Sequence, residues 1–204
     1  MDHTTYNAKL FGRWAPIYDG FELFLAGVRR EIVRTFDPAD KTILDVATGT
    51  GSLAIALSET ARAVTGIDLS EKMLDVARGK RAEDNLTFLQ MDAGDLAFQD
   101  DAFDVVTVSL GLHDMPPDIR TATVREAKRV LRPDGRLYVL EYDLPQDTAS
   151  GRWTARAFDL FESRYFRGFL KTDLTTYLSG LGFERMAKTS HLFGRLQLLT
   201  LRHA

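Results

Sequence analysis

The sequence predicts an α/β protein with a Rossmann-like, doubly wound sheet in a three-layer α/β/α arrangement. Between Lys41 and Glu141, short apolar runs rich in β-branched residues alternate with longer helical patterns, which is typical of a parallel sheet covered by helices on both faces. One of these runs ends in a glycine-rich turn that opens a helix, and such a turn suits a ligand at that edge of the sheet. A chain of 204 residues is long enough to bury a substantial core.

Five segments are short and mostly apolar, as expected for strands buried on both faces. They are Thr42–Val46, Ala63–Ile67, Leu86–Met91, Phe103–Ser109 and Arg136–Glu141. The helical patterns between them are Ser52–Thr60, Glu71–Arg81 and Asp118–Leu131. We expect the last helix to begin after Pro116-Pro117 and to end at Pro133-Asp134-Gly135, because proline and glycine interrupt helices.

Further elements flank this repeating unit on both sides. Before it, apolar side chains recur at helical spacing from Phe21 to Phe36, and an aromatic stretch, Phe11–Asp19, precedes them. After it come an aromatic and basic stretch, a predicted helix, and two predicted final strands joined by a turn at Gly194-Arg195. These segments are Arg152–Phe169, Leu174–Leu181, Phe183–Thr189 and Leu196–Arg202.

The chain contains no internal repeat and no linker rich in serine and glycine, so we expect residues 1–204 to form a single domain. Residues 1–38 would form a helical cap or lid. Residues 41–204 would form the sheet-bearing core, with an insert at about residues 145–172 that caps the site.

Composition excludes several classes of protein. Lys+Arg total 26 and Asp+Glu total 29, which gives a net charge of −3, and there is no Cys. Without a concentrated basic face we expect no nucleic-acid partner, and without Cys there is no disulfide, thiolate zinc site or Cys nucleophile. No cluster at ligand spacing predicts a metal site. The polar start and the lack of a run of about 20 apolar residues predict a cytoplasmic protein without a transmembrane segment.

The strongest local signal is the run from Ile43 to Ala54, in which an apolar strand meets Thr48-Gly49-Thr50-Gly51. Glycines at these two positions permit a tight turn and let the backbone approach a ligand without a Cβ in the way. The helix beyond presents free N–H groups. A plain turn between strand and helix has the same pattern, so neighbouring residues must decide between the two readings.

Carboxylates follow the next two predicted strands. Asp68 ends the second strand and Asp92 follows the third. Because the carboxyl ends of parallel strands meet at one edge, we expect both beside the glycine-rich turn. There Asp68 could accept both hydroxyl hydrogens of a ribose, and Asp92 would lie near an adenine. Either residue alone could instead cap a helix or make a turn.

Asp45 discriminates between possible nucleosides. Its carboxylate stands just before the glycines, where it would repel the pyrophosphate of NAD at close range. S-adenosylmethionine carries an ammonium and a sulfonium, so acidic residues near the turn match its charge. An NAD-dependent oxidoreductase on a Rossmann fold remains the alternative of another class, and a module that binds the cofactor without chemistry is a third.

Together these motifs resemble the class I S-adenosylmethionine-dependent methyltransferases, and most closely the ubiquinone/menaquinone-biosynthesis C-methyltransferase group. The resemblance runs from about Phe11 to Glu184, and its most specific block is Arg129–Glu141, in which R-V-L-R-P-D-G leads into a strand ending in Glu. It implies a seven-stranded sheet, mostly parallel with an antiparallel last strand. It also implies S-adenosyl-L-methionine as methyl donor and S-adenosyl-L-homocysteine as product.

The resemblance also implies positions for the cofactor. Around its methionine part would lie Asp45, Thr48, Gly49, Thr50 and Gly51. Asp68 would bind the ribose, with Leu69 and Met73 beside the adenine, Asp92 and Ala93 in contact with it, and Ser109 facing the cofactor. Tyr18 would belong to a lid, or with Trp14 to an aromatic clamp that packs the N-terminal segment onto the sheet.

The implied acceptor is a small molecule, lipophilic in the quinone enzymes and methylated at carbon or oxygen as a quinol or phenol. The chain departs from that group at substrate-facing positions: Gly111-Leu112-His113-Asp114 stands where the group has Gly-Leu-Arg-Asn, and Asp143 stands where it has Ser. A phosphatidylethanolamine N-methyltransferase is the competing resemblance, because some of these open with a similar Arg-Trp-Ala-Pro-x-Tyr-Asp segment. The sequence does not predict an oligomeric state.

His113 is the candidate general base, because it is the one histidine at a predicted strand end in the crevice. An imidazole there could take a phenolic or amine proton near neutral pH, with Asp114 orienting it. The alternative is a loop histidine bonded to nearby backbone. The aromatic and basic stretch at Arg152–Phe169 could cover the acceptor or contact a membrane surface peripherally, or it could be a solvated helix that buries its aromatic stripe.

Overall fold

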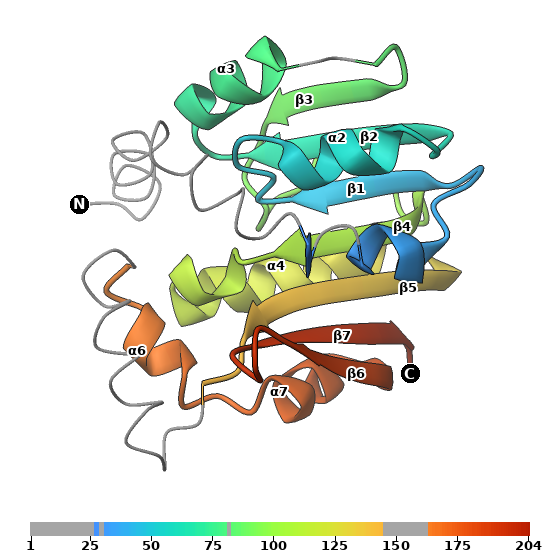
Figure 1. The fold of residues 1–204 in the computed structure, drawn as a ribbon. Coiled ribbons are helices and arrows are strands. Elements are labelled where there is room, and N and C mark those ends of the chain that lie inside the picture. The colour runs from blue at the N-terminus through green and yellow to red at the C-terminus, as the bar shows by residue number, and fades with distance from the viewer. Residues whose placement is uncertain (1–26, 29–30, 81–82, 145–162) are drawn as a thin grey trace.

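The computed structural model describes residues 27–28, 31–80, 83–144 and 163–204. They form a seven-stranded sheet with the order β3-β2-β1-β4-β5-β7-β6 (Figure 1). Its strands are β1 (Thr42–Val46), β2 (Ala63–Asp68), β3 (Leu86–Gln90), β4 (Phe103–Ser109), β5 (Leu131–Tyr142), β6 (Phe183–His191) and β7 (Leu196–His203).

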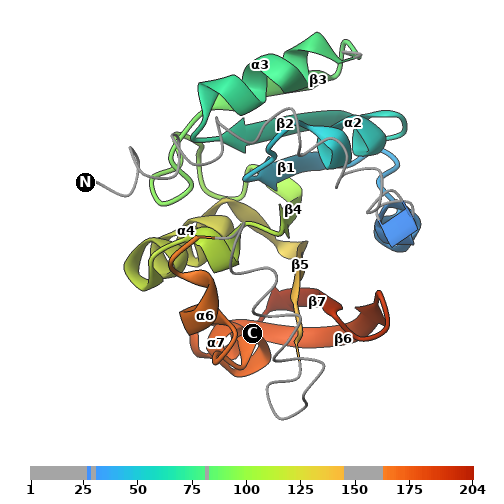
Figure 2. The same cartoon turned by 60° about the vertical axis from the view of Figure 1, so that its left-hand side comes forward.

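Strands β1 to β5 pair in parallel, and β7 lies antiparallel to both of its neighbours, β5 and β6. The predicted doubly wound sheet with an antiparallel last strand is therefore confirmed. The strands β3 and β6 lie at opposite ends of the sheet (Figure 2).

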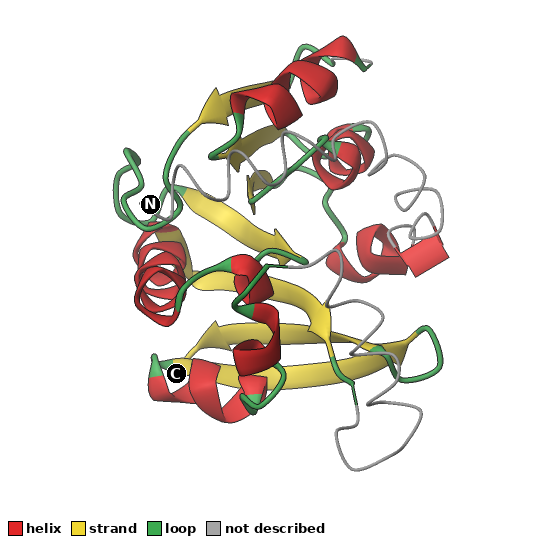
Figure 3. Cartoon of the chain, turned by 90° about the vertical axis from the view of Figure 1, so that its left-hand side faces the viewer, coloured by secondary structure: helices red, strands yellow, loops and turns green. Residues whose placement is uncertain are grey.

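Helices cover both faces of the sheet, as seen along the strands in Figure 3. They are α2 (Ser52–Ser58), α3 (Glu71–Gly79), α4 (Pro117–Val130), α6 (Phe166–Phe169) and α7 (Leu174–Gly180), with a 3-10 turn η1 (Leu112–Asp114) and helical residues at 31–36. One apolar core gathers α2, α3 and the segment near residue 32, and the other gathers α4 and α7. The parallel strands end at the edge where α6 lies (Figure 1).

The predicted break at Pro133-Asp134-Gly135 is placed differently in the structure. Helix α4 ends at Val130, and β5 begins directly with Leu131 instead of at Arg136. Leu131 pairs with Phe103, after which the register shifts before Arg136 pairs with Val105. Proline is tolerated at such a bulge because it does not have to donate to the ladder. The breaker residues thus lie within a bulge of the strand.

Candidate functional site

The glycine-rich turn leaves β1 at its carboxyl end and closes on itself before α2. The N–H of Thr48 donates to the carbonyl of Ile67 at 2.9 Å, and the N–H of Gly51 donates to the carbonyl of Thr48 at 3.0 Å. Ala47, Gly49 and Gly51 have φ of 55°, 56° and 77°. This left-handed backbone favours glycine, and its presence at Ala47 is a local cost of the kind found at binding sites.

The two glycines of the turn serve different purposes. A Cβ on Gly51 would lie 2.7 Å from Cζ of Phe88 and 2.9 Å from Cβ of Ala77, whereas a Cβ on Gly49 would meet no atom of the described residues within 4 Å. Glycine is therefore required at position 51 by packing. The sequence predicts that both glycines are there for the turn and for the approach of a ligand. Gly49 borders open space, so its backbone is free to be approached.

We expect Gly51→Ala to lower the free energy of unfolding by about 2–3 kcal/mol, since the new methyl group overlaps Phe88 in a backbone region unfavourable to alanine. Gly79→Ala is the matched control, because Gly79 is an exposed helical residue with no atom within 4 Å of its would-be Cβ. It should be stabilising by about 0.5–1 kcal/mol. Urea unfolding of both variants measures the difference, and equal stability would contradict the packing argument.

Asp45 lies beneath the turn. It is 1% exposed. Its Oδ2 accepts from Oγ1 of Thr48 at 2.6 Å, and its Oδ1 accepts from Oγ1 of Thr107 at 2.5 Å. The carboxylate thus holds the turn onto β4 and places a negative charge below it.

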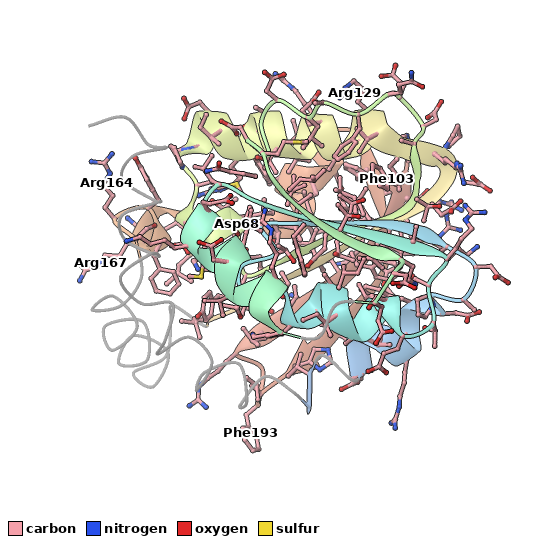
Figure 4. The ribbon with its side chains drawn as sticks, turned by 90° about the horizontal axis from the view of Figure 1, so that it is seen from above. Asp68, Phe103, Arg129, Arg164, Arg167 and Phe193 are labelled. Carbon is pink, nitrogen blue, oxygen red and sulfur yellow. The ribbon has the colours of Figure 1, made fainter. Side chains whose placement is uncertain are left out.

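Asp68 is fixed by backbone donors on both carboxylate oxygens. Oδ2 accepts from the N–H of Gly49 at 2.9 Å and Oδ1 from the N–H of Ser70 at 2.8 Å. Burial raises the pKa of Asp68 above its ordinary value. The backbone hydrogen bonds, the largest effect among them from Ser70, lower the pKa but do not cancel the effect of burial. Asp68 lies near the centre of Figure 4, beside α3. The structure therefore brings the second predicted acid directly to the glycine-rich turn.

The edge continues to the end of β3. The N–H of Met91 donates to the carbonyl of Asp68 at 3.1 Å, and Oδ1 of Asp92 accepts from the N–H of Gly94 at 2.8 Å. Asp92 thus stabilises a turn, which is the alternative role that the sequence allows, and it lies at the edge of the sheet where an adenine is expected. Leu69 and Ala93 are partly buried nearby. Met73 is 3% exposed and belongs to neither apolar core.

Thr50 carries the one orphaned polar atom found among the buried side chains that the structure describes. The residue is 3% exposed and its Oγ1 has no hydrogen-bond partner. Leaving a buried hydroxyl unpaired costs about 1–3 kcal/mol. A polar ligand group at the turn would remove that cost.

A second turn leaves β4 close to the first. Ser109 ends the strand, Leu110 has φ of 53°, and a Cβ on Gly111 would lie 2.8 Å from Cβ of Ala47. The two crossover turns therefore meet between β1 and β4. The strand order reverses at this point, which is where open α/β sheets bind ligands.

His113 lies in the 3-10 turn that follows and is 1% exposed. Its Nδ1 is 2.8 Å from Oε2 of Glu141, and its Nε2 is 3.1 Å from Oδ2 of Asp114. Burial alone would lower the pKa of His113, but the charges and hydrogen bonds of both carboxylates raise it well above its ordinary value. Both ring nitrogens thus lie against a carboxylate oxygen, and the raised pKa favours the imidazolium.

This geometry argues against the predicted role of His113 as general base. A base needs a free lone pair near neutral pH, and an imidazolium has none. Asp114 orients the ring as expected, but its other oxygen, Oδ1, accepts from the N–H of Ser163 at 3.1 Å. The pair is part of a buried network.

Sequence reasoning missed two members of this network. Glu141 is fully buried at the end of β5, where its Oε1 accepts from the N–H of Leu112 at 2.7 Å. Arg120, from α4, is 5% exposed, and its Nε donates to the carbonyl of Leu112 at 2.8 Å. A Glu at the end of a buried strand was the available signal for the first, because a buried carboxylate needs a partner.

Some predictions lie outside the described residues. Tyr18 and Trp14 are among them, as is most of the insert at about residues 145–172. Arg164 and Arg167, at the described end of the aromatic and basic stretch, point outward (Figure 4). In the part of the chain that the structure describes, no helix has the length and apolar character needed to cross a membrane.

The chain is similar in sequence to known methyltransferases. Residues 43–135 match the model of a methyltransferase domain. A demethylmenaquinone methyltransferase of Thermus thermophilus is 41% identical over 152 residues, which cover 70% of this chain and 68% of that protein. A protein of the same name from Porphyromonas gingivalis is 40% identical over 149 residues, which are 67% of this chain but only 60% of that protein.

A solved structure extends the likeness of fold. An S-adenosylmethionine-dependent methyltransferase from Mesorhizobium loti superposes with a TM-score of 0.63 at 20% identity, over 85% of this chain and 96% of that one. At this identity the likeness concerns the fold alone. The sequence relatives reach further, and with the matching domain model they settle the family: the chain belongs to the S-adenosylmethionine-dependent methyltransferases.

Proposed function

We propose that this methyltransferase moves the methyl group of S-adenosylmethionine to a small, lipophilic acceptor of the quinol or phenol type, at carbon or oxygen. The observation that carries the cofactor assignment is the carboxylate of Asp68, held by the N–H of Gly49 beside open space. The acceptor class is supported by relatives named demethylmenaquinone methyltransferase.

The residues at the two turns fit this cofactor. Asp68 has two oxygens for the two ribose hydroxyls, and the orphaned Oγ1 of Thr50 would find a partner in the methionine part. Asp45 below the turn supplies negative charge for a cationic ligand. Leu69, Met73, Asp92 and Ala93 would surround the adenine, and Ser109 would face the cofactor from β4. When bound, the cofactor supplies an activated methyl group.

The chain's own contribution is mainly alignment. Methyl transfer is an in-line displacement, so an enzyme gains most by holding the acceptor atom behind the methyl group and excluding water. The acceptor would lie beyond the turn after β4, where aromatic rings of Tyr142, Phe166 and Phe169 gather around His113. These rings are themselves buried, so they would support the acceptor side from beneath, and a lipophilic acceptor suits a position against such an apolar region.

Calorimetric titration tests the cofactor assignment. S-adenosylhomocysteine should bind, and NADH should not, because its pyrophosphate would meet the charge of Asp45. Binding of NADH alone would favour the oxidoreductase alternative.

Turnover assays with a demethylated quinol, a simple phenol and phosphatidylethanolamine vesicles then test the acceptor. Methylation of the quinol or phenol is the expected result. Methylation of the phospholipid alone would refute the proposed acceptor, and no turnover despite cofactor binding would indicate a binding module.

A further inference from the structure

We propose that His113 is a positioning residue which, clasped between Glu141 and Asp114, fixes α6 on the catalytic edge of the sheet and thereby shapes the acceptor side of the site. That α6 borders the acceptor rests on the proposed function, which this role of His113 deepens. It concerns a residue that does not take a proton from the acceptor.

The first step is the count of donors and acceptors around the ring. A neutral imidazole has one N–H, and its other nitrogen is an acceptor. Here carboxylate oxygens lie 2.8 Å from Nδ1 and 3.1 Å from Nε2. Between two ionised carboxylates a neutral ring would set a lone pair against an oxygen in a buried place, so this arrangement favours N–H donors on both sides.

The second step concerns charge. Within the described ranges, the titratable and charged groups around His113 include Glu141 and Tyr142 from β5, Asp114 from its own turn and Arg120 from α4, whereas α6 presents the phenyl rings of Phe166 and Phe169. With His113 protonated, two carboxylates are balanced by two cations. Loss of the proton would leave a net negative charge in a buried cluster, which is costly.

The third step connects the cluster to α6. Asp114 uses its second oxygen to hold the N–H of Ser163, just before α6. The imidazole ring centroid lies 5.7 Å from that of Phe166 and 6.1 Å from that of Phe169, and the guanidinium of Arg120 stands 4.8 Å over Phe169. The cluster therefore contacts both ends of this short helix.

Helix α6 depends on such contacts, because it cannot stand alone. It has four residues and no side-chain cap at its start, far below the length at which isolated helices are stable. Phe166 packs in one apolar core and Phe169 in the other. The helix thus joins the two cores at the edge of the sheet, so a shift at His113 would move α6 and alter the edge beside which the acceptor would lie.

Two measurements on the full chain, made without any acceptor, test the inference. NMR of the imidazole signals should show that His113 titrates above the usual midpoint of histidine, about 6.5; the variant His113→Gln identifies its signal among the four histidines. Hydrogen exchange should then show that the amides of Phe169 and Leu170, which are bonded within α6, exchange about tenfold faster or more in His113→Gln.

Matched variants separate the effect of charge from a general loss of structure. His191→Gln is the control, since His191 is also buried but pairs with the exposed Glu31; it should leave the exchange of α6 unchanged. Adding Glu141→Gln to His113→Gln removes the uncompensated charge and should restore part of the protection. Affinity for S-adenosylhomocysteine should change by less than about twofold in His113→Gln, because Asp68 and the glycine-rich turn, which would make the main cofactor contacts, follow other strands.

A midpoint for His113 at or below about 6.5 would overturn the inference, as would unchanged exchange of α6 in His113→Gln. If His113→Gln fails to fold, single variants of His3, His191 and His203 assign the remaining signal to His113, and the NMR titration of the native protein still decides. Loss of cofactor binding in the native protein would refute the proposed function instead, and leave these two readouts unaffected. Once an acceptor is known, a higher KM with an unchanged cofactor affinity is the expected kinetic result.

Discussion

Replacing Asp68 with alanine should weaken the binding of S-adenosylhomocysteine by at least about tenfold, because two charge-assisted hydrogen bonds to the ribose are lost at about 1.5–3 kcal/mol each. The carboxylate is held in place by the N–H groups of Gly49 and Ser70. Little ordering is therefore needed when the ligand arrives, and most of that interaction energy contributes to affinity. Calorimetric titration measures the change.

Asp75→Ala is the control for this variant. Asp75 is an exposed residue of α3 that lies 3.5 Å from Arg78, so its loss removes the same charge without touching the turn. Its affinity should stay within about twofold of the native value. Equal affinity in Asp68→Ala and the native protein would remove the proposed ribose contact.

The pKa of Asp68 gives this contact a pH dependence. Because burial raises the pKa above 3.8, the carboxylate becomes protonated at a higher pH than an ordinary aspartate does. A protonated carboxyl accepts ribose hydroxyls less well, so affinity should start to fall earlier on acidification. The same shift affects the free energy of unfolding. The contribution of Asp68 is fully present at low pH, where it is protonated, and is lost as pH rises through the folded-state pKa.

The sheet and the glycine-rich turn were predictable because each depends on local patterns. β1 and β4 have the predicted bounds, and the other strands differ at their ends. Asp68 needed only its place at the end of a strand, because parallel strands bring their carboxyl ends together. Such signals are contained in a few neighbouring residues.

The buried network was not predictable in the same way. His113 and Glu141 are 28 residues apart, and nothing in the spacing says that their side chains meet. The sequence predicts that Asp114 orients His113, but it does not predict the second contact of Asp114, to the N–H of Ser163. The packing of Phe88 against Gly51 also depends on an approach between distant segments. These features follow from tertiary packing, which local sequence does not determine.

Glu141→Gln should lower the free energy of unfolding by about 3–5 kcal/mol, because breaking a buried ion pair leaves its partner charge uncompensated. Glutamine keeps the shape of the side chain but turns one of two acceptor oxygens into a donor facing other donors, among them the N–H of Leu112 and Nδ1 of His113. Chemical denaturation gives the value. The exposed pair of Glu184 and Arg202 provides the control, and Glu184→Gln should cost less than about 1 kcal/mol.

The same pair predicts how stability varies with pH. The folded-state pKa of His113 is raised well above 6.5, so its contribution to stability is fully present below pH 6.5 and is lost as pH rises through the folded-state pKa. Native stability should therefore decline on the alkaline side of pH 6.5. In Glu141→Gln the imidazolium loses its fully buried partner at 2.8 Å, so the decline should be smaller. An identical pH slope in both proteins would mean that Glu141 does not hold the proton on His113, and that Asp114 alone does.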